Sequence, residues 1–373
     1  MPRGGSCMAK GGGNRKKEKP AEGSWDFLEK LMSVACPTGF EQPAQRVAEE
    51  FIRPYSDRVE KDVHGNLMAV LNPDAEFRIM LAGHCDEIGM MVSFVDEQGY
   101  IYVGQIGGID PTIYVGARVK ILSRKGPVLG VLGRRPIHLL PPEERGKPVK
   151  VSDLWIDIGA RDGKQARELV SIGDPAVIDV PYSRMLNEIV VARGFDDRIG
   201  TFVVMETMKL LHSRRDKLKT AVYAVSTVQE EIGLRGARTS AFSIDPRVGI
   251  AVDVGFATDY PGENKKEYGD IKLGKGPILH RGANINPVLA DLMEKTAAKK
   301  KIPFQMQAAP GSTGTDANVI QVNRGGVATS LVSIPNRYMH TPVEMVSLRD
   351  VADAARLIAE TILAIEPDMS FIP

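Results

Sequence analysis

The feature that most constrains the fold is the alternation of strand-like and helical segments after residue 184. Short apolar segments rich in β-branched residues predict buried strands, and recurrence of apolar residues at spacings of three and four predicts amphipathic helices between them. The predicted strands are TAVYAVSTV (220–228), VGIAVDV (248–254) and VATSLVSI (327–334), and the predicted helices lie near 199–213, 234–242, 286–300 and 348–365. This alternation predicts an α/β protein with a mixed sheet covered by helices on both faces.

The rest of the chain falls into three segments. Residues 1–23 are rich in Gly, Lys and Arg, which predicts a flexible basic tail. Residues 24–93 begin with two helical patterns and continue into strand-like segments. Between residues 94 and 180, short strand-like segments are separated by Gly and Pro, which predicts an inserted β-rich domain. We therefore expect a main domain of residues 24–93 and 181–373, interrupted by residues 94–180.

Composition excludes several classes of protein. The 48 Lys and Arg residues nearly balance the 47 Asp and Glu residues, so no basic excess indicates nucleic acid as a partner. The three cysteines are scattered and form no CxxC pair, which excludes a disulfide framework and a thiolate metal site. The sequence contains neither a secretory apolar stretch near residue 1 nor an 18-residue apolar run. We expect a cytoplasmic protein that acts on a small molecule or peptide and has no membrane partner.

Two of the six histidines occupy positions suited to metal binding. His84 ends an apolar strand in GHCDE. Because side chains of a strand alternate between its two faces, Asp86 points to the same side as His84, where its carboxylate can orient the imidazole. His340 follows SIPNRYM, also where a strand gives way to a loop. The remaining histidines have no acidic partner at a useful spacing and are expected to be structural or exposed: His64, His138, His212 and His280.

Acidic residues also gather at the ends of predicted elements. GFDDRIG places Asp196 and Asp197 at the start of a helix, and STVQEEIG places Glu230 and Glu231 after a strand. Helix capping and solvent exposure are alternative explanations for these two pairs. Asp253 follows apolar residues in VGIAVDV, where a buried carboxylate without a partner would be costly unless a cation neutralised it.

The carboxyl ends of strands in an open α/β sheet converge on one crevice, and His84, Glu231, Asp253 and His340 all lie at such ends. Oxygen and imidazole ligands favour two divalent cations, with zinc, cobalt or manganese more suitable than calcium. A cation-bound water would lose its proton near neutral pH, and Glu230, to which no metal is assigned, is the natural general base. Glycoside hydrolysis requires two carboxylates separated by the width of a sugar. Glu230 and Glu231 are adjacent in the sequence, which suits a single site with a metal-bound hydroxide better.

The motifs together resemble those of tetrahedral (TET) aminopeptidases, a family related to glutamyl aminopeptidases and to proteins called cellulase M. The resemblance runs from about residue 25 to residue 366. The motifs that carry it are GHCDEIGMMV, GFDDRIG, VQEEIGLRGA, VDVGFATDYPG, LGKGP, GTDANVIQ and SIPNRYMHTPVEMVSLRDV. It implies a metalloaminopeptidase that hydrolyses N-terminal residues from short peptides.

The resemblance also implies roles for individual residues. His84 and Asp253 would hold one metal ion, Glu231 and His340 would hold the other, and Asp196 would bridge both. Glu230 would be the general base and Asp86 would orient His84. The Asp196–Asp197 peptide bond would be cis. The loop from Gly314 to Ala317 would shape the floor of the pocket, although the start of a helix explains it equally well.

The β-rich insertion would, by the same resemblance, be a small β-barrel-like lid and dimerisation domain. Dimers would assemble into a hollow dodecamer shaped as a tetrahedron, with the active sites inside. Cys85 occupies a position where relatives often have an apolar residue. Because side chains of a strand alternate between its two faces, Cys85 points away from the metals, which predicts a packing role.

Three alternatives remain at this point. A different dinuclear amidohydrolase, such as a carboxypeptidase or a deacylase, could share the same metal ligands. A non-catalytic scaffold built on this fold would have no need for an intact metal site and a general base. An endoglucanase agrees least with the adjacent carboxylates.

Overall fold

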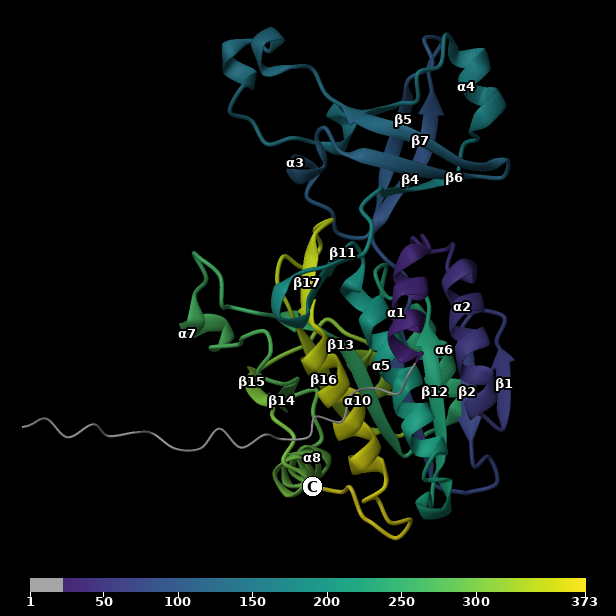
Figure 1. Ribbon diagram of the computed structural model, residues 1–373, viewed down its shortest axis with the longest axis vertical. Coiled ribbons are helices and arrows are strands. Elements are labelled where there is room, and N and C mark those ends of the chain that lie inside the picture. The colour runs from purple at the N-terminus through teal and green to yellow at the C-terminus, as the bar shows by residue number, and fades with distance from the viewer. Residues whose placement is uncertain (1–22) are drawn as a thin grey trace, which may run out of the picture.

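The computed structural model describes residues 23–373, and the predicted basic tail lies outside them except for Gly23. Figure 1 shows two parts, a broad helix-covered sheet and a smaller β-barrel joined to it by short segments. Within the described residues, no helix combines the length and the apolar character needed to cross a membrane.

The main sheet has eight strands in the order β1-β2-β12-β3-β13-β16-β14-β15. Their bounds in chain order are β1 (Arg58–Lys61), β2 (Leu67–Leu71), β3 (Arg78–His84), β12 (Ala221–Thr227), β13 (Val248–Phe256), β14 (Ile278–Gly282), β15 (Gln305–Ala309) and β16 (Ala328–Asn336). The four central strands β12, β3, β13 and β16 are mutually parallel. Strand β2 pairs antiparallel with β1 and β12, and β14 pairs antiparallel with β16, so the sheet is mixed, as predicted.

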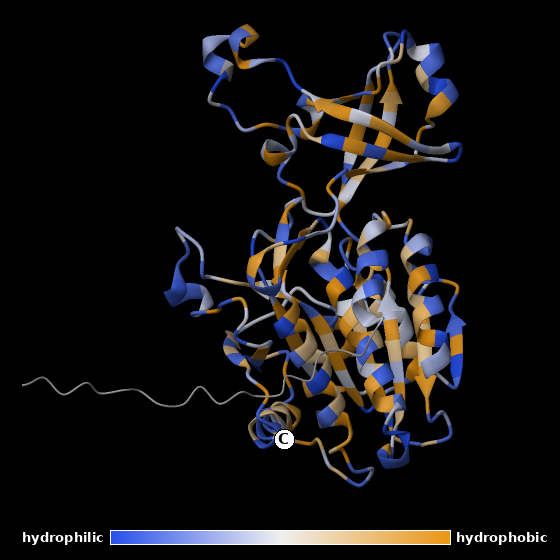
Figure 2. Ribbon diagram, viewed as in Figure 1, coloured by the Kyte–Doolittle hydropathy of each residue, from blue (hydrophilic) through white to orange (hydrophobic). Residues whose placement is uncertain are grey.

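Helices cover both faces of this sheet, which confirms the predicted fold class (Figure 1). One face packs against α1 (Ser24–Ser33), α2 (Gln42–Ile52), α5 (Phe195–His212), α8 (Pro287–Lys300) and α10 (Leu348–Ile362). The other face packs against α6 (Arg235–Ile244) and α9 (Ala317–Ile320). Figure 2 shows the consequence in hydropathy, because the strands are mostly apolar and the helices carry apolar and polar stripes.

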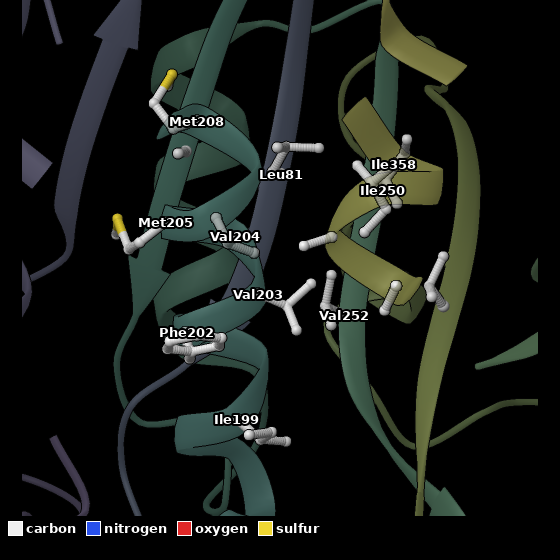
Figure 3. Close-up of a cluster of buried hydrophobic side chains, with 14 of the residues drawn as sticks. Leu81, Ile199, Phe202, Val203, Val204, Met205, Met208, Ile250, Val252 and Ile358 are labelled. Carbon is white, nitrogen blue, oxygen red and sulfur yellow. The ribbon is translucent and has the colours of Figure 1, made fainter. Parts of the chain in front are cut away.

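The larger core lies between α5, α10 and the central strands. Figure 3 shows Phe202, Val203 and Met205 of α5 with Leu81 of β3 and Ile250 of β13 in this cluster. Successive residues of β3 alternate between the two cores, since Ile79 and Leu81 belong to the larger one and Met80 to the smaller one. The central strands are therefore apolar on both faces, which explains their continuous apolar sequences.

The inserted residues form a closed six-stranded barrel in the order β4-β5-β8-β7-β6-β9. Its strands are β4 (Gly89–Val95), β5 (Ile101–Ile106), β6 (Arg118–Ser123), β7 (Gly126–Gly133), β8 (Trp155–Asp157) and β9 (Pro175–Ile178), with the short helices α3 (Pro111–Tyr114) and α4 (Gly163–Leu169) beside them. The barrel has a hydrophobic core of its own. Its first strand begins at Gly89, ahead of residue 94, because the long apolar stretch from 77 to 95 serves both parts of the protein.

Several short elements have no clear signal in the sequence. A small sheet joins β10 (Ser183–Arg184), β11 (Ile189–Ala192) and β17 (Glu344–Ser347) where the barrel meets the main sheet. Helix α7 (Lys265–Tyr268) lies in an outer loop. Single 3₁₀ turns occur at Arg53–Tyr55, Ile137–Leu139, Pro142–Glu144, Val151–Asp153, Leu186–Glu188 and Arg215–Lys217. These elements are too short for hydrophobic periodicity to reveal them.

Backbone approaches backbone closely at Gly83, near the carboxyl end of β3. A Cβ atom there would lie 2.4 Å from the carbonyl carbon of Gly200 in α5 and 2.7 Å from the nitrogen of Thr201. We predict that Gly83→Ala lowers the free energy of unfolding by roughly 1–3 kcal/mol, because the backbone of α5 must move. Chemical denaturation of Gly83→Ala and of Gly104→Ala measures this, since a Cβ at Gly104 meets nothing within 4 Å. Equal stabilities would contradict the prediction.

Candidate metal centre

The carboxyl ends of the central parallel strands bring the predicted metal ligands together. His84 is the last residue of β3, Asp253 lies near the end of β13, and Glu230 and Glu231 follow β12. His340 follows β16 and Asp196 lies in the first turn of α5. All six residues line one cavity of about 620 Å³. The convergence that the strand pattern predicted is therefore present.

Asp196 lies between the two histidines. Its Oδ1 is 3.2 Å from Nε2 of His84, and its Oδ2 is 3.1 Å from Nε2 of His340. Each carboxylate oxygen thus faces a different imidazole. A carboxylate in this position can bridge two cations, one beside each histidine.

The backbone around Asp196 departs from helical geometry. Asp196 has φ −74° and ψ 105°, and the peptide bond to Asp197 is cis, which confirms the sequence-based expectation. The side chain of Asp197 turns back, so that its Oδ2 accepts a hydrogen bond from the His84 nitrogen (3.2 Å) and its Oδ1 accepts one from the Gly200 nitrogen (3.0 Å). Asp197 therefore joins the start of α5 to the end of β3.

Two sets of ligand atoms are close enough to share a cation. One atom from each of His84, Asp196 and Glu231 lies within 4.8 Å of the others, and the same holds for His84, Asp197 and Asp253. Glu230 is also close, with its Oε2 3.6 Å from Nε2 of His84. Asp197 was not among the predicted ligands, although it is adjacent to the predicted bridge.

Asp86 contacts His84, which it was expected to orient, and several other groups as well. The Nδ1 of His84 is 3.1 Å from the Asp86 carbonyl oxygen and 3.4 Å from its carboxylate. The same carboxylate accepts hydrogen bonds from the Glu230 nitrogen (3.1 Å), the Glu231 nitrogen (3.3 Å) and the Thr38 hydroxyl (2.8 Å). Asp86 thus positions both the imidazole and the pair of glutamates.

The buried acids lack cationic partners on the protein. The described residues that line the cavity include neither Lys nor Arg. Burial, together with the neighbouring carboxylate of Asp196, raises the pKa of Glu230 to about 10 and that of Asp253 to about 8. Glu231 Oε1 is buried without a hydrogen-bond partner. The histidine, aspartate and glutamate donors fit divalent metal ions, which would supply the missing positive charge.

Glu344 connects two of the predicted ligands and was not identified from the sequence. One of its oxygens accepts a hydrogen bond from the Asp196 nitrogen (3.0 Å), and the other accepts one from the His340 nitrogen (2.9 Å). The only sequence signal is its place in HTPVEMV, four residues after His340. The fully buried Glu344 carboxylate fixes the distance between the Asp196 turn and the His340 loop.

A loop of the barrel contacts one of the predicted ligands. The Nδ1 of His340 lies 3.0 Å from the carbonyl oxygen of Gly108, in the loop after β5. This contact makes Nδ1 the protonated nitrogen and leaves Nε2 facing Asp196 and Glu231. In the same loop Gly107 has φ +70°, and a Cβ atom there would lie 3.4 Å from Glu231.

A buried ion cluster supports the segment that leads into α5. The Arg193 Nη1 lies 2.5 Å from both oxygens of Glu87, and the Arg198 Nη2 lies 3.0 Å from one of them. Arg198 also donates to the carbonyl oxygens of Arg193 and Gly194. Burial alone would raise the pKa of Glu87, but the two guanidinium groups hold it below its usual value. The cluster therefore fixes the backbone just before Asp196.

The other residues singled out in the sequence occupy various places. Gly314 and Thr315 line the cavity, and the adjacent Asp316 accepts a hydrogen bond from the Thr227 hydroxyl (2.7 Å). His280 is buried, as a structural histidine would be, but it also lines the cavity, which the sequence did not reveal. Cys85 is fully buried in the larger core, away from the metal ligands, which confirms its packing role.

The chain is similar to known peptidases over most of its length. Residues 65–357 match the family model for M42 glutamyl aminopeptidase. The chain is 36% identical over 354 residues to a lysyl aminopeptidase of Pyrococcus furiosus, covering 94% of this chain and 99% of the relative. A TET aminopeptidase structure from a marine sediment thaumarchaeon superimposes with a TM-score of 0.89 at 36% identity, covering 92% of this chain and 97% of that one.

A third similarity concerns assembly. The Pyrococcus horikoshii TET1 peptidase, which can assemble into a tetrahedron or a large octahedral shell, has a TM-score of 0.81 and 31% identity. The alignment covers 90% of this chain and 98% of the other.

The Glu87 cluster makes a testable contribution to stability. We predict that Glu87→Gln lowers the free energy of unfolding by about 3–5 kcal/mol, because two buried guanidinium groups lose their counter-charge. The matched control is Glu366→Gln, which removes an exposed partner of Lys219 and should cost less than about 1 kcal/mol. Urea denaturation measures both values, and a Glu87→Gln protein as stable as the control would show that the cluster is not required.

Proposed function

The chain belongs to the M42 glutamyl aminopeptidase family, and we propose that it is an aminopeptidase that uses two divalent cations to remove N-terminal residues from short peptides. Its membership makes it a peptidase, a hydrolase of peptide bonds. The observation that carries the proposal of two cations is the position of Asp196, whose two carboxylate oxygens face the Nε2 atoms of two different histidines.

In this proposal, His84 and Asp253 hold one cation, Glu231 and His340 hold the other, and Asp196 binds both. The proximity of ligand atoms of His84 and Asp253 supports the first pair, and the 3.8 Å between His340 Nε2 and Glu231 Oε2 supports the second. Zinc suits this mixture of imidazole and carboxylate donors, and cobalt or manganese would also suit it.

When bound, the cations would polarise the scissile carbonyl and lower the pKa of the attacking water. The protein supplies the proton transfer. Glu230 would accept a proton from the water on its carboxylate as the water oxygen bonds to the carbonyl carbon. It would then deliver this proton to the nitrogen of the leaving amine as the C–N bond breaks. The hydrogen bond from the Glu230 nitrogen to Asp86 holds the base beside His84.

The charges in the cavity favour an aminopeptidase over a carboxypeptidase. A peptide N-terminus carries a positive charge, which the carboxylate of Glu230, to which no cation is assigned, would attract. A peptide C-terminus carries a carboxylate, and the described residues that line the cavity offer no Lys or Arg to bind it. Among the alternatives raised by the sequence, family membership and this charge distribution agree best with removal of N-terminal residues.

We expect Glu230→Gln to lower kcat/KM on amino-acid anilides by at least roughly 100-fold, because the amide cannot accept the water proton. Metal analysis should find about two ions per chain in both the wild type and the variant, since Glu230 is not a ligand in this proposal. Glu50→Gln, an exposed change on α2, is the control and should retain full activity. Normal turnover by Glu230→Gln would remove Glu230 from its role.

The barrel is a candidate for the lid and dimerisation domain. Strand β7 exposes apolar side chains on its outer side, with Leu129 55% exposed and Val131 47% exposed. The similarity to a peptidase that forms a tetrahedron supports self-association through dimers into a dodecamer. Burying these side chains against another copy would be favourable.

Light scattering of the wild type should therefore give the mass of a large homo-oligomer, and Leu129→Asp should shift it toward smaller species. The new carboxylate would be desolvated in an interface. Circular dichroism checks that the variant remains folded. A stable and active monomer of the wild type would refute the assembly while leaving the chemistry intact.

A further inference from the structure

The cavity beyond the metal centre carries no charge among the residues that the structure describes. Every Asp and Glu on its wall belongs to the predicted metal centre, and its remaining side chains are apolar or uncharged. The apolar part of the wall comes from several segments: Leu234, Val254, Phe256, Tyr268, Leu331 and Met339.

The one remaining titratable histidine on the wall is neutral near pH 7. His280 is buried, with its Nε2 2.9 Å from the hydroxyl of Ser333. Burial lowers the pKa of His280 to about 4, so the ring carries no charge. Its contact with Ser333 uses one ring nitrogen within the wall itself. His280 therefore offers a substrate no counter-ion.

The rim of the cavity is aromatic and partly open to solvent. Phe256 is 50% exposed and Tyr268 is 38% exposed, and their rings meet edge to face with centroids 5.8 Å apart. A substrate side chain that covered these rings would remove apolar surface from water on both molecules. Gln307 adds an uncharged polar group, whose amide donates to the carbonyl oxygen of Tyr268 (3.0 Å).

We propose that this cavity accepts N-terminal residues with uncharged, mainly apolar side chains and discriminates against lysine, arginine, aspartate and glutamate. The inference rests on the aminopeptidase function proposed above and adds the class of substrate. An apolar side chain gains from burial against the wall, whereas a charged one loses its hydration without gaining a counter-ion. This preference differs from the one that the name of the Pyrococcus furiosus lysyl aminopeptidase states for that protein.

Charged groups beside the rim residue Tyr268 lie on α7. Lys265, Lys266 and Glu267 do not line the cavity, and Lys265 pairs with Asp270 at 2.7 Å. Glu267 accepts a hydrogen bond from the Tyr268 hydroxyl. A substrate lysine would have to pass the wall and reach outward to contact this carboxylate.

The first experiment measures kcat/KM of the metal-loaded full-length protein on the p-nitroanilides of leucine, methionine, phenylalanine, lysine and glutamate. The three apolar substrates should each exceed lysine and glutamate by roughly 100-fold. Comparable rates on lysine or glutamate would overturn the inference, and in the lysine case would implicate Glu267. Hydrolysis of any anilide supports the aminopeptidase function separately, and hydrolysis of none would contradict that function itself.

The second experiment places a charge on the wall. Gln307→Glu should raise the ratio of lysine to leucine activity by at least roughly 10-fold, since the new carboxylate can pair with the substrate ammonium. Gln98→Glu makes the same chemical change at an exposed turn of the barrel and should leave the ratio unchanged. Circular dichroism verifies that the variant is folded. If it does not fold, the substrate preference of the wild type still tests the proposal. An unchanged ratio in a folded, active Gln307→Glu protein would show that the cavity does not receive the side chain.

Discussion

The structure depends on one electrostatic constraint, the concentration of buried carboxylates where the central strands end. Asp196, Glu230, Glu231 and Asp253 lie within one cavity whose described lining contains no Lys or Arg. Isolated carboxylates in such surroundings are expensive, and the raised pKa values of Glu230 and Asp253 reflect that cost. Metal binding and the stability of this edge of the sheet are consequently linked, because bound cations would also neutralise the carboxylates that are buried there.

The surrounding protein holds these acids through backbone contacts as well as side chains. Glu344 ties the Asp196 and His340 backbones together, and Asp86 does the same for Glu230 and Glu231. Each support is itself a buried carboxylate that accepts N–H groups. The loops that carry the predicted ligands are thereby fixed at their backbones, which would leave the side-chain oxygens of these residues free for cations.

Much of this could be predicted from the sequence, and what could not has physical reasons. The apolar strands and the amphipathic helices predicted the mixed, helix-covered sheet, because burial on two faces leaves a strong pattern. His84 and Glu231 were predicted as ligands because strand ends converge, and Asp196 drew attention because it begins a helix beside a second aspartate. Glu344 was missed because its role depends on two backbone N–H groups brought together only by folding. The cavity wall was missed for the same reason, since its residues come from many loops.

The hydrogen bond from His340 to the Gly108 carbonyl oxygen has a consequence for protein engineering. The barrel looks like a detachable unit, with its own closed sheet and its own core. One of its loops nevertheless selects the imidazole nitrogen that faces Asp196. A chimaera that exchanged the barrel between relatives would therefore have to carry this loop across with its register intact, and a shortened protein without the barrel would lose control of the tautomer of a predicted ligand.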